Sequence, residues 1–117
     1  MTLDTDILIA GGGLNGPALA LALAQGGFRV TVVDSRPPRA RAEAGFDGRA
    51  YALAIASVRL LTAIGVWPRV ADKAQPMLEI KASDGRAGEG AAPFFLHLDH
   101  AEIEEGPMGH MLEDRFL

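Results

Sequence analysis

The sequence predicts an α/β fold that begins with a strand, a helix and a second strand. Three observations support this prediction. An apolar strand is expected from Asp6 to Ala10, a glycine-rich turn follows it, and a β-branched strand is expected from Arg29 to Val33. An Ala- and Leu-rich helix, roughly Leu14 to Gln25, joins the two strands. This order is typical of a Rossmann-type βαβ unit that binds a dinucleotide.

The glycine-rich turn carries the strongest functional signal. Gly11 permits the tight turn, Gly13 lets the backbone approach a pyrophosphate, and Gly16 lets the helix pack closely on the strand. The N–H groups at the helix start point outward, where the helix dipole favours negative charge. We therefore expect a pyrophosphate site formed by Gly11, Gly12, Gly13, Leu14, Asn15 and Gly16.

The end of the second strand predicts the ribose contact. Asp34 follows the glycines at a distance of about 20 residues, where an acid accepts hydrogen bonds from ribose hydroxyls and disfavours the 2′-phosphate of NADP. We expect Ser35 and Arg36 beside that ribose. Arg39 and Arg41, in the Pro-containing loop that follows, are interpreted as solvated loop charges.

Composition excludes several classes of protein. The chain has 117 residues, enough for one small domain, and its net charge of −4 gives no basic face for nucleic acid. It contains no cysteine, which excludes disulfides and agrees with a reducing compartment, so cytoplasm is the default location. Glycines and Pro17 interrupt the apolar stretch from Ile7 to Ala24, and its leader is acidic. Both features argue against a signal peptide or a membrane span.

The middle of the chain predicts two further helices. Ala54, Val58 and Leu61 recur on one face of a helix expected from about Ala54 to Ile64, and this face is interpreted as core. Gly65 ends that helix, and Pro68 begins a short helical turn that runs to about Lys73. Trp67 is expected to pack before this turn, and a ligand platform is the alternative for it.

From residue 78 to residue 83, apolar and polar residues alternate with the period of two that is typical of strands. Strands are expected at residues 78–83, with one face wet, at 94–98 and at 108–112, in an antiparallel arrangement. His97, Asp99 and His100 are residue types that bind metals, but we interpret them as an exposed polar strand end and predict no metal site. We divide the chain into residues 1–75, the start of a dinucleotide-binding domain, residues 76–112, a β-rich segment, and residues 113–117, the first turn of a truncated helix. The sheet is expected to be incomplete, as in a fragment or a short chain that needs a partner.

Three segments together resemble the N-terminal part of FAD-dependent aromatic hydroxylases, most closely those of ubiquinone biosynthesis. They are residues 6–16, residues 47–54 with 60–67, and residues 109–115, and the likeness covers nearly the whole chain. The resemblance implies a flavoprotein monooxygenase that uses FAD, NAD(P)H and O₂ to hydroxylate a polyprenylated phenol, with possible peripheral membrane contact. It also implies that Arg49 approaches the FAD phosphates or ribityl chain, with Arg115 a weaker candidate. A surface ion pair with Asp47 is the alternative for Arg49.

The length departs from this family, whose members are several times longer. Their second flavin motif, a Gly-Asp segment, has no counterpart in these 117 residues. We therefore expect the chain alone to be inactive, with no catalytic residue of its own, and to bind FAD weakly or not at all. Two alternatives stay open. The chain is part of an FAD- or NAD-dependent oxidoreductase of another class, or it is a nucleotide-binding module without enzymatic activity.

Overall fold

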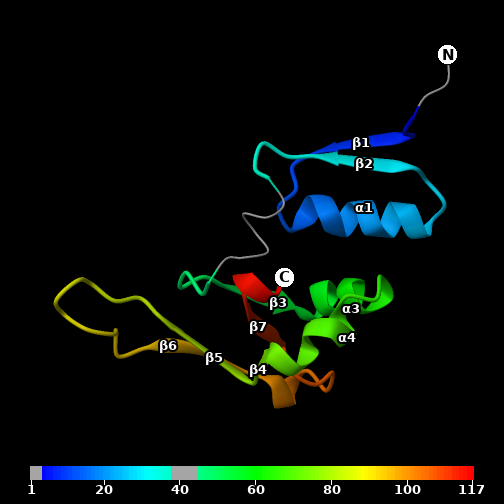
Figure 1. Cartoon of the computed structure of the whole chain (residues 1–117). Helices are drawn as coiled ribbons and strands as arrows, with labels where there is room; N and C mark the ends of the chain where they lie inside the picture. The colour runs from blue at the N-terminus through cyan, green and yellow to red at the C-terminus, as the bar shows by residue number, and fades with distance from the viewer. Residues whose placement is uncertain (1–3, 38–44) are drawn as a thin grey trace.

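The computed structural model describes residues 4–37 and 45–117 and shows a mixed α/β fold (Figure 1). We refer to residues 4–37 as the N-terminal unit and to residues 45–117 as the C-terminal region. Arg39 and Arg41, predicted to be solvated loop charges, lie outside the described residues.

The N-terminal unit has the predicted strand, helix and strand. Strand β1 (Ile7–Ala10) and strand β2 (Val30–Val33) pair in parallel, with Ile7 opposite Val30 and Ala10 opposite Val33. Helix α1 (Asn15–Gln25) connects them and packs on both strands. Gly27 ends the helix in a left-handed conformation, with φ of 93°, which favours glycine. The two predicted strands and the helix between them are thus confirmed to within one residue.

A second sheet organises the C-terminal region. Strand β7 (Gly109–Glu113) lies between β3 (Ala50–Ala54) and β4 (Gln75–Met77), and both pairings are antiparallel. Neither β3 nor β4 is predicted from the sequence, because Gln75–Met77 is very short and Ala50–Ala54 contains three alanines, which have low strand propensity. A Cβ on Gly109 would collide with the Leu53 carbonyl oxygen, so only glycine fits this crossing.

Two short helices follow β3. Helix α3 (Ile55–Ala63) and helix α4 (Trp67–Val70) are present, and η1 (Ala71–Lys73) continues α4 as a 3₁₀ turn. One detail of the prediction is wrong: Ala54 is the exposed last residue of β3 and does not belong to the helical core face. Val58 and Leu61 are only half-buried, because the short helix contacts the sheet along part of its length.

The remaining strands form a hairpin that projects away from the rest of the chain (Figure 1). Strand β5 (Glu79–Ser83) pairs antiparallel with β6 (Phe95–Asp99), and Ile80 lies opposite Leu98. The predicted alternation is present, but every residue of β5 is exposed, so the expected buried face is wrong for this structure. A two-stranded sheet has no second layer of its own to cover its apolar face.

The last residues of the chain form a shorter helical turn than predicted. Glu113 is the last residue of β7, and Asp114–Phe116 form the 3₁₀ turn η3. A further 3₁₀ turn, η2 (His100–Glu102), follows β6. The β3–β7–β4 sheet contains residues from both sides of the predicted division at residue 75, and that division stays a prediction.

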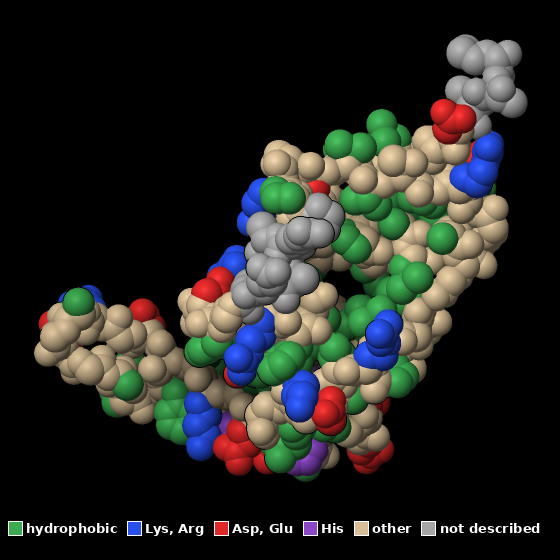
Figure 2. Space-filling view, viewed as in Figure 1, with side chains coloured by type: hydrophobic (Ala, Val, Ile, Leu, Met, Phe, Trp, Pro, Cys, Tyr) green, Lys and Arg blue, Asp and Glu red, His purple; other side chains and the backbone are tan. Residues whose placement is uncertain are grey.

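The described part of the chain is extended and has a small core. Its buried apolar side chains are Ile64, Val70 and Leu112, all in the C-terminal region. The radius of gyration is 18.6 Å, whereas a compact domain of 100 residues has about 13 Å. Figure 2 shows hydrophobic side chains at the surface of both regions. Among the described residues, no helix is long and apolar enough to cross a membrane.

Candidate dinucleotide-binding site

The turn after β1 has the geometry that the glycine spacing predicts. Gly11 has φ of 111°, in the left-handed region, and its N–H donates to the Val33 carbonyl at 2.7 Å, which fixes the turn to β2. A Cβ on Gly16 would collide with the Gly11 carbonyl oxygen. Gly16 is therefore required by packing within the turn itself, before any ligand is considered.

Gly13 differs from Gly16 because the space around it is open. A Cβ built on Gly13 meets no atom within 4 Å, so the fold alone does not require glycine at this position. The first turn of α1, which follows directly, has no acidic residue, and its N-cap residue Leu14 provides no side-chain cap. The amide groups at this helix start are therefore suited to an external anion such as a phosphate.

Asp34 joins the end of β2 to the glycine turn. Its Oδ2 accepts a hydrogen bond from the Gly12 N–H at 2.6 Å, and its Oδ1 accepts one from the Arg36 N–H at 2.7 Å. Asp34 is half-buried, while Ser35 and Arg36 are exposed. The structure thus brings Asp34 against the glycine turn, and the hydrogen bonds from the Gly12 and Arg36 N–H groups orient its carboxylate.

Arg49 lies in the C-terminal region, directly before β3, and is held by two acids. Its Nε donates to Asp47 Oδ2 at 2.7 Å, and its Nη2 donates to Asp114 Oδ2 at 3.1 Å. The hydrogen bond that the Arg49 side chain donates to Asp47 lowers the pKa of Asp47 and raises the pKa of Arg49. A hydrogen bond with Asp114 raises the pKa of Tyr51. The ion pair with Asp47, predicted as the alternative for Arg49, is therefore present, and Asp114 is a second partner that no sequence pattern indicated.

Arg115, the weaker candidate, is also engaged locally. Its Nε donates to Glu113 Oε2 at 2.6 Å, and its guanidinium carbon lies 4.8 Å from the centre of the Phe116 ring. These two partners are two residues or fewer away in the sequence, and the guanidinium carbon also lies 5.7 Å from the centre of the more distant Phe46 ring. Within the part of the chain that the structure describes, the hydrogen bonds and ion pairs of Arg49 and Arg115 are all made inside the C-terminal region.

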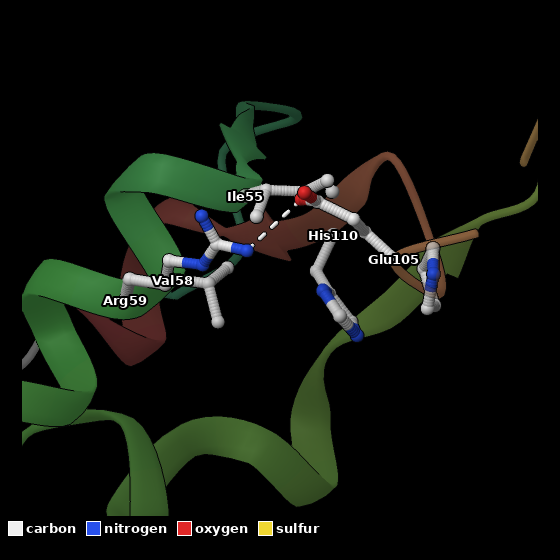
Figure 3. A pocket seen from close by; sticks show the side chains of 7 residues that line it. Ile55, Val58, Arg59, Glu105 and His110 are labelled. Carbon is white, nitrogen blue, oxygen red and sulfur yellow. Dashed lines mark hydrogen bonds and ion pairs between the residues drawn. The ribbon is translucent and has the colours of Figure 1, made fainter. Parts of the chain in front are cut away.

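A small pocket lies elsewhere in the C-terminal region, between α3 and the segment before β7 (Figure 3). Arg59 Nη2 donates to Glu105 Oε2 at 2.9 Å at its edge. Nδ1 of His110 is buried without a hydrogen-bond partner among the described residues, and the ring contacts Trp67 edge-on with centroids 4.9 Å apart. The pocket volume is about 130 Å³, whereas ligand pockets usually have about 300–1,000 Å³. It is too small for a dinucleotide.

The structure adds one residue to the polar strand end. Glu79, which the sequence pattern places on the wet face of its strand, lies opposite Asp99 across the hairpin. Glu79, His97 and Asp99 place one potential metal-ligating atom each within 4.8 Å of one another. Strand alternation alone does not show this group, because it depends on the register between β5 and β6.

Comparison with known proteins relates the chain to a flavin-binding family. The family model described as "FAD binding domain" matches residues 4–107. The chain is 47% identical over 112 residues to the ubiquinone hydroxylase UbiL of Rhodospirillum rubrum, an alignment that covers 96% of this chain and 25% of that protein. It is 36% identical over 115 residues to the 3-demethoxyubiquinol 3-hydroxylase of Escherichia coli, covering 97% of this chain and 28% of that protein.

A third relative is more distant. The chain is 31% identical over 88 residues to the ubiquinone hydroxylase UbiM of Neisseria meningitidis, covering 74% of this chain and 19% of that protein. The chain therefore spans about a quarter or less of the length of these curated relatives. The predicted resemblance to hydroxylases of ubiquinone biosynthesis is confirmed over most of the chain.

Proposed function

Because the chain belongs to the FAD-binding domain family, we propose that it forms the N-terminal, FAD-binding part of a flavin-dependent monooxygenase. The reaction proposed for the whole protein is hydroxylation of the aromatic ring of a polyprenylated phenol with NAD(P)H and O₂. The relatives named as ubiquinone hydroxylases and as a 3-demethoxyubiquinol 3-hydroxylase support this substrate class. The family match favours FAD over NAD as the resident dinucleotide.

The observation that carries the proposal is the contrast between Gly13 and Gly16. Packing against Gly11 explains why residue 16 is glycine. Gly13 has no such structural reason, because the space around it is open. A pyrophosphate lying against the backbone supplies that reason, because a Cβ at Gly13 would occupy its place. The uncapped start of α1 faces the same turn and offers N–H groups to the anion.

Each residue of the site has a proposed role. The turn residues Gly11, Gly12, Gly13, Leu14, Asn15 and Gly16 bind the pyrophosphate. Asp34 accepts hydrogen bonds from the adenosine ribose, with Ser35 and Arg36 beside it. The hydrogen bonds from the Gly12 and Arg36 N–H groups hold the Asp34 carboxylate beside the turn, where this role requires it.

Arg49 is proposed to approach the FAD phosphates or ribityl chain. Asp47 and Asp114 hold its guanidinium from two sides, which restricts the side chain before any ligand binds. FAD, when bound, supplies the redox chemistry, and the residues of this chain bind and orient it. A cytoplasmic location, peripheral membrane contact of the whole protein and the division at residues 75 and 112 belong to the same proposal.

Titration of the ¹⁵N-labelled chain with FAD tests the binding site. We expect weak binding, with amide shifts at residues 12–16 and 34–36 and no complex retained through gel filtration. Gly13→Ala is expected to fold normally and to lose these shifts. Gly45→Ala is the matched control, because its Cβ also meets no atom within 4 Å but lies outside the turn. Equal FAD shifts in Gly13→Ala and in the original chain would contradict the proposed site.

Sequencing the coding region past the codon for Leu117 tests the larger proposal. A reading frame that continues through a Gly-Asp flavin segment, with a product that hydroxylates a phenol, is the expected result. A stop codon directly after Leu117, together with FAD binding and no turnover, would favour a binding module without enzymatic activity. The two experiments are independent, since the binding site can be right while the reaction is wrong.

A further inference from the structure

The hairpin carries a group of metal-ligating side chains on its polar face. The register places Glu79 opposite Asp99 and Lys81 opposite His97, so these four side chains share one face, because alternate residues of a strand point the same way. The other face carries Ile80, Ala82, Leu96 and Leu98. The charged group is therefore a property of strand pairing, which unites residues from two separate parts of the sequence.

The distances within this group suit a transition-metal ion. His97 Nε2 lies 3.4 Å from Glu79 Oε2. In a tetrahedral Zn²⁺ site with bonds of about 2.0–2.1 Å, two ligand atoms lie about 3.3 Å apart. An oxygen of Asp99 completes a set in which the three ligand atoms lie within 4.8 Å of one another, so a small side-chain rotation brings all three to one ion.

The surroundings of the group hold two of its members in place. The Phe95 ring, on the same face, lies 6.4 Å from the His97 ring. Asp99 Oδ1 accepts a hydrogen bond from the Ala101 N–H at 2.9 Å. His100 Nδ1 lies 3.0 Å from the Leu78 carbonyl oxygen and 3.2 Å from Asp99 Oδ1, so His100 contacts one of the three ligating side chains. Contacts of this kind orient metal ligands and strengthen binding.

We propose that Glu79, His97 and Asp99 form a site for a divalent transition-metal ion, with Zn²⁺ as the probe. One imidazole and two carboxylates form a ligand set that Zn²⁺ accepts, and water would complete the coordination at this exposed position. The ion would connect β5 to β6 at the base of the hairpin and thereby hold the register of a two-stranded sheet that has no covering layer. This site is separate from the glycine turn and does not depend on the proposed function.

Lys81 is the natural competitor of the ion. Its Nζ lies 3.3 Å from Glu79 Oε2, so its ammonium group neutralises part of the charge that the metal would use. Removing this charge with Lys81→Met is expected to strengthen Zn²⁺ binding by about three- to tenfold, since like charges near a cation site oppose binding. A gain of affinity is a sharper test than a loss, because damage to the fold does not produce it.

Isothermal titration of the full chain with ZnCl₂ tests the site. One ion per chain is expected, with amide shifts confined to residues 79–83 and 95–99. Glu79→Gln and His97→Gln are each expected to weaken binding at least about tenfold. Both side chains are exposed, so the variants retain the fold. Glu89→Gln, at an exposed position between β5 and β6, is the matched control and is expected to leave the affinity within about twofold, because Glu89 is outside the ligand set.

Three results would overturn the proposal. Unchanged binding in His97→Gln would show that the imidazole is not a ligand. Equal losses in Glu79→Gln and Glu89→Gln would indicate non-specific binding to surface carboxylates. Absence of Zn²⁺ binding to the original chain and to Lys81→Met would show that the group is an ordinary exposed cluster of charges.

Discussion

The N-terminal unit contains the candidate dinucleotide-binding site, and the C-terminal region contains the buried core. The N-terminal unit contains the glycine turn and Asp34, yet α1 has no fully buried residue and the described core includes nothing from this unit. The C-terminal region contains all three buried apolar side chains, at Ile64, Val70 and Leu112. One hydrogen bond, from Gln25 Nε2 to the Ile64 carbonyl at 2.8 Å, links the end of α1 to that core.

This difference teaches that a well-formed candidate site does not need a large local core. The glycine turn is fixed by backbone contacts, such as those between Gly11 and Val33 and between Gly12 and Asp34. The β3–β7–β4 sheet is fixed by the pairing of distant residues and by burial of Leu112. The following predictions separate the two kinds of support, beginning with the largest expected effect.

Truncation of Leu112 should have the largest effect on stability. Its side chain is 1% exposed, so Leu112→Ala is expected to lower the free energy of unfolding by about 2–5 kcal/mol. Leu96 is 60% exposed on β6, and Leu96→Ala is the matched control, with a change within about 0.5 kcal/mol. Urea unfolding followed by circular dichroism measures both. Equal effects would mean that the described core does not determine stability.

Alanine substitutions in the glycine turn should separate folding from binding. Gly16→Ala is expected to lower the free energy of unfolding by about 1–3 kcal/mol, because its Cβ collides with backbone. Gly13→Ala, which adds the same methyl group in open space, should leave stability nearly unchanged and weaken FAD binding. Thermal unfolding and FAD titration of both variants test this contrast. It is refuted if Gly13→Ala unfolds as readily as Gly16→Ala.

Neutralising Asp34 should weaken nucleotide binding and change the preference between nucleotides. Asp34→Asn keeps the side-chain shape but replaces one accepting oxygen with an NH₂ donor, so one of the Gly12 and Arg36 N–H groups loses its acceptor. We expect about tenfold weaker binding of FAD and a smaller preference for AMP over its 2′-phosphorylated counterpart. Asp72→Asn, at an exposed position in η1, is the control. An unchanged nucleotide preference in Asp34→Asn would remove Asp34 from the proposed ribose site.

The smallest effects should come from one exposed ion pair in each region. Hydrogen bonds from Arg29 lower the pKa of Asp6 from its ordinary value of 3.8, and those from Arg49 lower the pKa of Asp47 in the same way. A lowered folded-state pKa stabilises the fold above the unfolded value, and this contribution is lost as pH falls through the folded value. The loss should therefore occur below about pH 4 in both regions.

Carboxyl NMR titration measures these two pKa values directly. Arg29→Gln should raise the pKa of Asp6 toward 3.8 and leave Asp47 unchanged, while Arg49→Gln should do the reverse. Added salt should reduce both shifts, because the pairs are exposed. If Arg29→Gln shifted the pKa of Asp47, the two regions would be coupled electrostatically. The hydrogen bonds of these two ion pairs do not provide such a coupling, because each pair lies within one region.

The parts of the fold that the sequence predicted are those with short-range causes. The strands at residues 6–10 and 29–33, the helix between them and its glycine end are encoded by residues close together in the chain. Strand β3 was not predicted, because Ala50–Ala54 becomes a strand by pairing with Gly109–Glu113, and no local pattern reports that pairing. The same reason explains why Asp114 was missed as a partner of Arg49.

By itself, the sequence determined the glycine turn, the acid that follows β2 and the family to which the chain belongs, because these features depend on residue types at fixed spacings. Only the tertiary structure decided that Gly16 is constrained by packing while Gly13 is open, that Arg49 is held between two acids, and that Glu79 meets His97 across the hairpin. These facts depend on the distances between residues that strand pairing and helix packing bring together, and spacing along the chain does not specify them.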